Sequence, residues 1–340
     1  MKRSIDLLLR GEAMIYVAGR LFDIDDKLKS ERLEEAVLAG VRDAAAPAVI
    51  PAGLRPTFVP FRDVGQEELV ADDKTRQLFD MDLVRLRRTV LLVSYIDGMA
   101  KDEGVCFEIG FARMAGAAIL LISTDFFEIV LPNGEAVPLD PLLYTTATRL
   151  IRRPQLVESG QTFRETLQES RAAVLADVRS AVHDLLRRAP EERPEPYKPV
   201  ETATDQLEVL IDFGGMVYEW QTLLYRKLER LIGPTTRMRL VRTQRYDAAS
   251  SRAAGRHDLD ALMRADLLVT CTDLDEAPAG TAILQGAMCA LGRPIWMYDS
   301  KRTVILASGG YRSSRNLMLD YSATRRFRTL DDLAAALRAL

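Results

Sequence analysis

The sequence predicts an α/β protein made of two tandem doubly wound parallel-sheet domains of the Rossmann or flavodoxin-like type. Short buried strands alternate with amphipathic helices in the first half, and the second half repeats that pattern. The length of 340 residues is also about twice that of a common domain. Such sheets bind ligands at the carboxyl ends of their strands, so functional residues are expected just after each strand.

The elements of the first half follow from the spacing of apolar residues. Residues 14–18 and 89–96 are predicted to be buried strands, because each is a short apolar run. Residues 25–46 and 104–116 carry apolar side chains at helical spacing. A further helix at 161–188 leads into RAPEERPEPYKP, whose four prolines and clustered charges indicate a linker.

The second half begins after this linker, with a boundary near residue 200. There LEVLIDFGG resembles another first strand and turn, and ADLLVTCTD resembles another central strand. We therefore expect a catalytic domain at 1–150, a helix and proline-rich linker at 151–200, and a degenerate second copy at 201–340.

A fixed offset of 176 residues aligns the two halves without adjustment. The aligned positions include strand, loop and helix residues, which makes internal duplication a better explanation than coincidence. The matching residues are Asp82 with Asp258, Leu91–Val93 with Leu267–Val269, Asp97 with Asp273, and Gly104, Gly110 and Gly116 with Gly280, Gly286 and Gly292.

The composition is that of an ordinary globular protein. Hydrophobic residues make up 48% and charged residues 28%, and the net charge of −3 gives no reason to expect nucleic acid or an acidic membrane as a partner. The N-terminal apolar run is too short for a signal peptide, and no stretch is long enough to span a bilayer. We expect a cytoplasmic protein.

The cysteines give no metal or disulfide pattern. There are three of them, without CxxC spacing, and only two histidines to join them. The chain also has no dinucleotide glycine fingerprint and no phosphate-binding Walker loop. The sequence therefore predicts no metal site and no cofactor.

The densest group of polar residues follows the strand at 89–96. Asp97 and Gly98 come directly after it, and Asp102, Gly104 and Glu108 follow toward and into the next helix. The two glycines permit a tight turn and a close approach to a ligand, and the N-terminal part of a helix favours an ionised carboxylate. These residues are expected at the ligand crevice.

Two neighbouring carboxyl groups are what glycosyl transfer through a covalent intermediate requires. One attacks the anomeric carbon and the other supplies a proton to the leaving group. Glu108 is the predicted nucleophile, and Asp82 and Asp102 are both candidates for the acid. The alternative is that such residues cap a helix or lie in solvent and have no chemical role.

The N-terminal half resembles the nucleoside 2-deoxyribosyltransferase family. The resemblance rests on IYVAGRLF, FVPFRD, DMDLVRLRRTVLLVSYIDG, DEGVCFEIGFA and a strand ending in Asp125, in that order, over most of residues 14–125. It implies that Glu108 is the nucleophile that attacks C1′, that Asp102 and Asp82 hold or protonate the base, and that Tyr16 lies near the nucleophile.

One position departs from the family pattern. Arg20, after Gly19 in AGRLF, stands where a proline or a small residue is usual and where the chain approaches the sugar. An arginine there either binds a 5′-phosphate through its planar guanidinium group or lies in solvent. Sugar specificity therefore stays open.

The second copy lacks the nucleophile, because Leu284 and Pro278 stand at the positions of Glu108 and Asp102. The resemblance implies sites built across a subunit interface, with an asparagine of an NLM string reaching the neighbour's sugar. Here that asparagine is Asn316, whereas the first copy has Asp140 in its place. We expect one composite site per chain, in which an intrachain pseudo-dimer brings Asn316 to Glu108.

The expected substrate is a small nucleoside or nucleotide. If a second base accepts the glycosyl group, the chain is a transferase, and if water does, it is a nucleoside or nucleoside 5′-monophosphate N-glycosidase. A third alternative is a non-catalytic nucleotide-binding sensor or scaffold. Assembly of several identical chains into a homo-oligomer also stays open.

Overall fold

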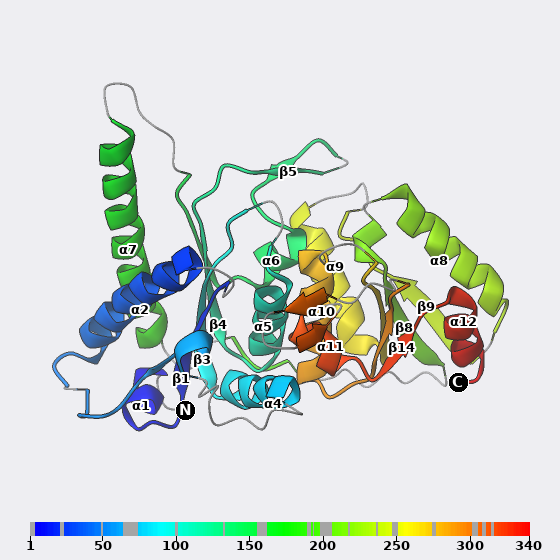
Figure 1. The fold of residues 1–340 in the computed structure, drawn as a ribbon, viewed down its shortest axis with the longest axis horizontal. Helices are drawn as coiled ribbons and strands as arrows, with labels where there is room; N and C mark the ends of the chain where they lie inside the picture. Colours follow the sequence, from blue (N-terminus) through cyan, green and yellow to red (C-terminus); the bar gives the residue numbers. More distant parts are fainter. Residues whose placement is uncertain are drawn as a thin grey trace. The chain divides into compact units, whose positions relative to one another are not determined.

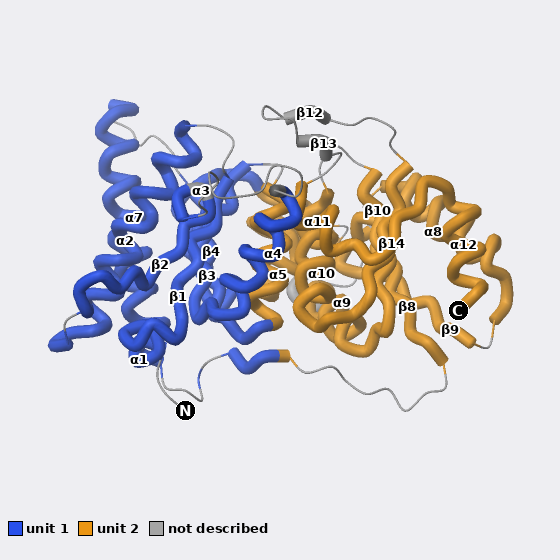
Figure 2. The backbone as a smooth tube through the Cα atoms, turned by 60° about the horizontal axis from the view of Figure 1, so that its bottom comes forward, with its two compact units in different colours: residues 1–99, 115–127, 147–196 blue, residues 100–114, 128–146, 197–340 orange. Residues whose placement is uncertain are grey.

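The computed structural model divides the chain into two compact units, shown in Figure 2. Unit 1 comprises Met1–Met99, Ala115–Phe127 and Ala147–Pro196, and unit 2 comprises Ala100–Met114, Glu128–Thr146 and Tyr197–Leu340. The predicted boundary near residue 200 and part of the IYVAGRLF string lie outside the described residues. The structure describes residues 4–20, 24–48, 50–63, 74–98, 101–131, 133–154, 162–188, 192, 194–197, 206–216, 218–235, 237–246, 251–273, 277–300, 305–307, 311–313 and 316–340.

Unit 1 contains a five-stranded parallel sheet. Its spatial order is β2-β1-β3-β4-β7, which is second, first, third, fourth and fifth in chain order if a separate small hairpin is left aside. This is a doubly wound order with a switch point between the first and third strands. The strands are β1 (Met14–Ala18), β2 (Thr57–Phe58), β3 (Thr89–Tyr95), β4 (Ala118–Ser123) and β7 (Arg149–Arg152).

One face of this sheet is covered by α1 (Ser4–Leu9), α2 (Ile24–Ala45) and α7 (Phe163–Arg187) (Figure 1). Ile15 and Val17 of β1 belong to the same core cluster as apolar residues of these helices. Because successive side chains of a strand point to opposite faces, Tyr16 points to the other face. Unit 1 also contains α3 (Pro60–Asp63) and α4 (Lys74–Arg87).

Unit 2 contains a second parallel sheet of five strands. Its spatial order is β14-β11-β10-β8-β9, so the second strand in chain order again lies beside the first, followed by the third, fourth and fifth. The two sheets therefore have the same topology, and the predicted fold class is confirmed. The strands are β8 (Leu207–Asp212), β9 (Met238–Arg242), β10 (Leu267–Cys271), β11 (Ile295–Tyr298) and β14 (Arg325–Phe327).

Two groups of helices cover the sheet of unit 2 (Figure 1). On one face, α8 (Glu219–Ile232) and α12 (Leu330–Arg338) enclose the hydrophobic core. On the other side lie α9 (Ser251–Arg264), α10 (Ala279–Ala290) and α11 (Leu317–Ser322), together with α5 (Glu103–Met114) and α6 (Pro141–Thr146) from the first half of the chain. A short 3₁₀ helix, η4 (Gly214–Met216), follows β8.

Several elements of the second half repeat those of the first at the offset of 176. The bounds of α10 and α11 are those of α5 and α6 shifted by this number. Two small antiparallel hairpins repeat as well: β5 (Ile129–Val130) with β6 (Ala136–Val137), and β12 (Ile305–Ala307) with β13 (Tyr311–Ser313). The pair Ile129–Val137 in the first corresponds to Ile305–Ser313 in the second.

Helices α5 and α10 pack against each other in a two-fold symmetric way. A β-carbon on Gly110 would lie 2.1 Å from the carbonyl oxygen of Ile283, and one on Gly286 would lie 2.0 Å from that of Phe107. Ile283 is the counterpart of Phe107, and Gly286 is the counterpart of Gly110, so the two contacts are equivalent. Such reciprocity is the mark of an isologous interface.

The predicted elements agree closely with these bounds. The strand at 14–18 is confirmed, and the helices predicted at 25–46 and 161–188 begin and end within two residues of α2 and α7. The helix predicted at 104–116 ends earlier, at Met114, because Gly116 has a φ of +90° that ends helical geometry. None of the helices in the described part of the chain is long and apolar enough to span a membrane.

Candidate functional site

Tyr16 and Asp82 form a buried pair within unit 1. The Tyr16 side chain is fully buried, and its ring packs on Phe58 with centroids 5.3 Å apart. The hydroxyl of Tyr16 hydrogen-bonds to the carboxyl group of Asp82 in α4. The tyrosine is therefore both a core residue and the partner of a buried acid.

Asp82 has the properties of a proton donor. It is 9% exposed, and its Oδ1 atom has no hydrogen-bond partner among the described residues. Burial raises the pKa of this carboxyl group from 3.8 to about 7, and the hydrogen bond from Tyr16 and the charge of Arg85 oppose only part of that rise. A large fraction of the group is therefore protonated at neutral pH.

Asp97 and Gly98 hold the loops at the carboxyl ends of β3 and β4. Asp97 accepts hydrogen bonds from the backbone N–H of Thr124 at 2.6 Å and from its hydroxyl at 2.9 Å, and it pairs with Lys29. Burial raises the pKa of Asp97, but Lys29 and these hydrogen bonds more than offset the rise and leave it below its usual value. Gly98, with a φ of +91°, donates to Asp125 at 2.6 Å.

The second copy keeps the same loop contact. Asp273, the counterpart of Asp97, accepts from the backbone N–H of Ser300 at 2.5 Å and from its hydroxyl at 2.8 Å. Ser300 is in turn the counterpart of Thr124. Because this contact is also present in the second half, where Leu284 stands in place of Glu108, it accounts for Asp97 as a structural residue that shapes the edge of the sheet.

Gly19 and Arg20 follow β1. A β-carbon on Gly19 would lie 2.7 Å from the hydroxyl oxygen of Ser30 in α2, so only glycine fits without a shift. Arg20 is exposed. Gly19 is therefore explained by helix packing, and binding of a phosphate by Arg20 stays a prediction.

Asp102 caps the N-terminus of α5 in unit 2. Its Oδ1 atom accepts a hydrogen bond from the backbone N–H of Val105 at 2.8 Å. The counterpart residue, Pro278, is the N-cap of α10 and makes no side-chain cap. Asp102 therefore caps a helix, which is the alternative role that the sequence left open for it.

Asn316 lies against α5. A β-carbon on Gly104 would lie 2.6 Å from the amide nitrogen of Asn316, so the missing side chain of this glycine makes room for the amide. The amide oxygen accepts a hydrogen bond from the backbone N–H of Met318 at 2.9 Å and caps α11. Asn316 therefore caps a helix through its oxygen and places its nitrogen on Gly104.

Glu108 lies one turn farther along α5. Residues four apart share one face of a helix, so Glu108 and Gly104 lie on the same face. Glu108 is 8% exposed. Unit 2 thus brings Gly104, Glu108 and Asn316 to one helix face, whereas Tyr16 and Asp82 belong to unit 1.

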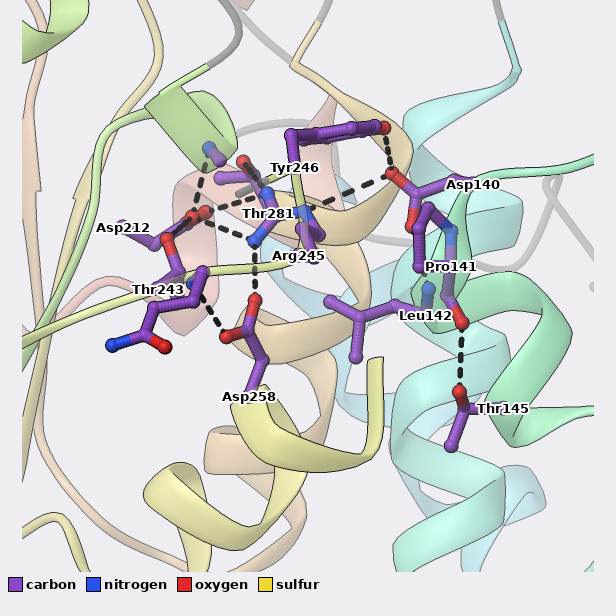
Figure 3. Close-up of polar contacts among 12 residues, drawn as sticks. Asp140, Pro141, Leu142, Thr145, Asp212, Thr243, Arg245, Tyr246, Asp258 and Thr281 are labelled. Atoms are coloured by element: carbon purple, nitrogen blue, oxygen red, sulfur yellow. Dashed lines mark hydrogen bonds and ion pairs between the residues drawn. The ribbon is translucent and has the colours of Figure 1, made fainter. Parts of the chain in front are cut away.

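The corresponding place in the second copy is filled by an arginine, shown in Figure 3. Arg245 is fully buried, and its Nη1 atom lies 2.8 Å from Asp212 and 3.3 Å from Asp258, the counterpart of Asp82. A β-carbon on Gly280, the counterpart of Gly104, would lie 2.4 Å from Nε of Arg245. The guanidinium group therefore occupies the position that Asn316 has in the first copy.

Asp140 completes this second cluster. It is the counterpart of Asn316, and like Asn316 it caps a helix, by accepting from the backbone N–H of Leu142 at 2.8 Å. Its other oxygen accepts from the hydroxyl of Tyr246 at 2.5 Å and lies 3.7 Å from Nε of Arg245. A negative side chain at this position thus matches the buried positive charge.

Sequence reasoning missed Arg245 and Glu103. The carboxylate of Glu103 accepts hydrogen bonds from the backbone N–H groups of Asn316 and Ala277. The sequence did hold a signal for Arg245: Asp140 stands where the other half has Asn316, and a buried carboxylate needs a positively charged partner. No comparable signal marks Glu103.

The described residues offer no metal centre, because they contain no group of three or more histidine, cysteine, aspartate or glutamate side chains that could hold an ion. Cys106 and Cys271 are buried, Cys289 is partly exposed, and none of the three is in a disulfide bond.

Comparison with known proteins gives a family match within the N-terminal half. Residues 15–139 match the family model of nucleoside 2-deoxyribosyltransferase. A search of curated proteins gives no match. The matched segment contains Tyr16, Asp82, Asp102 and Glu108.

Proposed function

Residues 15–139 belong to the nucleoside 2-deoxyribosyltransferase family, and from this we propose that the chain makes or breaks the N-glycosidic bond of a nucleoside or nucleotide. The reaction passes through a covalent glycosyl-enzyme on Glu108. The observation that carries the proposal is that the matched segment contains two buried carboxyl groups, those of Glu108 and Asp82. The pKa of Asp82 is raised to about 7, and Glu108 lies in α5 one turn after Gly104, the residue on which Asn316 lies.

In the proposed first step, a carboxylate oxygen of Glu108 bonds to C1′ while the bond from C1′ to the base nitrogen breaks. The electron pair of that bond goes to the base, which takes the proton of Asp82. Asp82 is favoured over Asp102 as this acid, because burial raises the pKa of Asp82 to about 7, whereas the carboxyl group of Asp102 is engaged as an N-cap.

In the second step an acceptor attacks C1′ and releases Glu108. A nucleobase as acceptor gives a new nucleoside, and water gives a free sugar. In either case the acceptor loses a proton as its bond forms, and ionised Asp82 takes it up. The protonation cycle is then closed without a metal or redox cofactor.

The proposed site is a composite of two copies of one ancestral domain. The reciprocal contact of Gly110 and Gly286 and the repeated bounds of α5 and α6 support a duplication that turned a dimer interface into an intrachain one. Arg245 fills the corresponding place in the second copy. Each chain accordingly carries one site.

The test compares the wild-type protein with Glu108→Gln, which keeps the size of the side chain and removes its nucleophilic charge. Both are incubated with mixed nucleosides and nucleoside 5′-monophosphates, with and without a free base, and the products are separated by chromatography. The exposed Glu135→Gln is the matched control. Base exchange that is lost only in Glu108→Gln identifies a transferase, and base release without exchange identifies a hydrolase.

A second measurement tests the covalent step. A 2′-fluoro nucleoside slows an oxocarbenium-like reaction and should leave a glycosyl group on the peptide that contains Glu108, detected by mass spectrometry. No adduct and no turnover of any nucleoside or nucleotide would favour the non-catalytic binding protein.

A further inference from the structure

Glu103, the first residue of α5, bridges two segments that belong to the second half of the chain. Its Oε1 atom accepts a hydrogen bond from the backbone N–H of Asn316 at 2.8 Å, and its Oε2 atom accepts one from the backbone N–H of Ala277 at 2.7 Å. Ala277 comes just before α10, and Asn316 comes just before α11. One carboxylate therefore fixes the approach to both helices.

Only a carboxylate fits this arrangement. Both partners are N–H donors, so both side-chain oxygens must accept, and a glutamine in the same place offers one acceptor and one donor. Hydrogen bonds to an ionised acceptor are also stronger than those to a neutral one. The first turn of α5 favours a negative charge as well.

The bridge restricts how Asn316 can orient its side chain. The backbone of Asn316 is held by Glu103, and its amide oxygen is held by the N–H of Met318. With the oxygen occupied, the amide nitrogen is the end that lies on Gly104. An N–H donor is thereby presented on the helix face that also carries Glu108.

The second copy lacks this bridge. Ala279 begins α10 as Glu103 begins α5, and an alanine side chain accepts no hydrogen bond. The residue that corresponds to Asn316 there is Asp140, which is held by Tyr246 and paired with Arg245 instead. The carboxylate bridge is thus found only in the copy that keeps the nucleophile.

We propose that Glu103 is a positioning residue for glycosyl transfer, which acts by holding the Asn316 amide as a hydrogen-bond donor to an oxygen of the substrate beside Glu108. This inference rests on the proposed function. Glu103 itself makes no contact with the substrate in this scheme, so its whole effect on turnover passes through Asn316.

A double-mutant cycle tests this dependence. The variants are Glu103→Gln, Asn316→Ala and the two combined, with Glu135→Gln as a control for an exposed change of the same kind. We expect Asn316→Ala to lower kcat/KM about 10- to 100-fold, as for loss of one hydrogen bond to the substrate, and Glu103→Gln to lower it about tenfold. The combined variant should be no slower than Asn316→Ala.

The pattern of the kinetic constants separates positioning from a general structural effect. Glu103→Gln should divide its loss between kcat and KM as Asn316→Ala does, and Glu103→Asp, which keeps both acceptors, should recover part of the activity. Multiplied losses in the combined variant would overturn the proposal, and so would a Glu103→Asp protein as slow as Glu103→Gln. If Glu103→Gln does not fold, the cycle is run with Glu103→Asp, and multiplied losses in the combined variant would again overturn the proposal.

A measurement that needs no turnover distinguishes this inference from the proposed function. The side-chain amide resonance of Asn316, assigned by its absence in Asn316→Ala, should move in Glu103→Gln and stay in place in Glu135→Gln. An unmoved resonance refutes the positioning role. A wild-type protein that turns over no nucleoside and no nucleotide refutes the proposed function, and the resonance then still reports whether Glu103 orients the amide.

Discussion

Replacing Asp82 by asparagine should remove a pH-dependent loss of stability. The pKa of Asp82 is raised in the folded protein to about 7, from 3.8, chiefly by burial. A carboxyl group with a raised folded-state pKa adds stability that is fully present below the unfolded-state value and is lost as the pH rises through the folded-state value. The free energy of unfolding should therefore fall as the pH rises from about 4 to about 7.

The size of the effect follows from the same two pKa values. Each pH unit between them changes the free energy of unfolding by about 1.4 kcal/mol, which gives about 4 kcal/mol in total and about 2 to 3 kcal/mol between pH 5 and pH 8. This conversion is justified because Asp82 is only 9% exposed. Asparagine has the same shape and does not ionise, so its variant should lack this slope.

Urea denaturation at several pH values from 5 to 8 measures the difference. Asp80→Asn is a matched control, because Asp80 lies in the same helix, is exposed and pairs only with Arg76 at the surface among the described residues. Tyr16→Phe is a third arm: it removes a hydrogen bond that lowers the folded-state pKa of Asp82, so its free energy of unfolding should continue to fall to a higher pH than that of the wild type. Parallel pH profiles for wild type and Asp82→Asn would refute the assignment of a raised pKa.

Two further changes test the interior of unit 2. Arg245→Ala should lower the free energy of unfolding by about 3 to 5 kcal/mol, because it leaves buried carboxylates without their cation. Arg256 is exposed, and Arg256→Ala should change the free energy of unfolding by less than about 0.5 kcal/mol. Equal losses in the two variants would contradict the described cluster. Gly110→Ala and Gly286→Ala should each cost about 1 to 3 kcal/mol by forcing α5 and α10 apart. Since either change already separates the helices, the double variant should lose less than the sum, and full additivity in denaturation curves would argue against a shared contact.

Much of the fold follows from local patterns in the sequence. The strand at 14–18 is a short apolar run, and α5 has apolar residues at helical spacing, so both can be recognised without knowledge of their partners. The fixed offset between the halves also predicted that Gly110 and Gly286 are equivalent positions. The offset says nothing about their role, which depends on the carbonyl groups they approach.

The contacts that shape the site depend on residues far apart in the chain. Glu103 looks like any acidic residue at the start of a helix, and its backbone partners lie 174 and 213 residues away. Arg245 follows a strand as many exposed arginines do, and its burial becomes apparent only when Asp140, Asp212 and Asp258 surround it. Composition and periodicity carry no record of such pairings.

The two-fold packing of α5 on α10 also bears on how such a protein can change over generations. In a dimer of identical subunits, one codon encodes both members of every symmetric pair, so a substitution alters both sites at once. When the two copies share one chain, each position has its own codon. Arg245 and Asp140 on one side, and Glu108 and Asn316 on the other, are a combination that no single gene for identical subunits can encode.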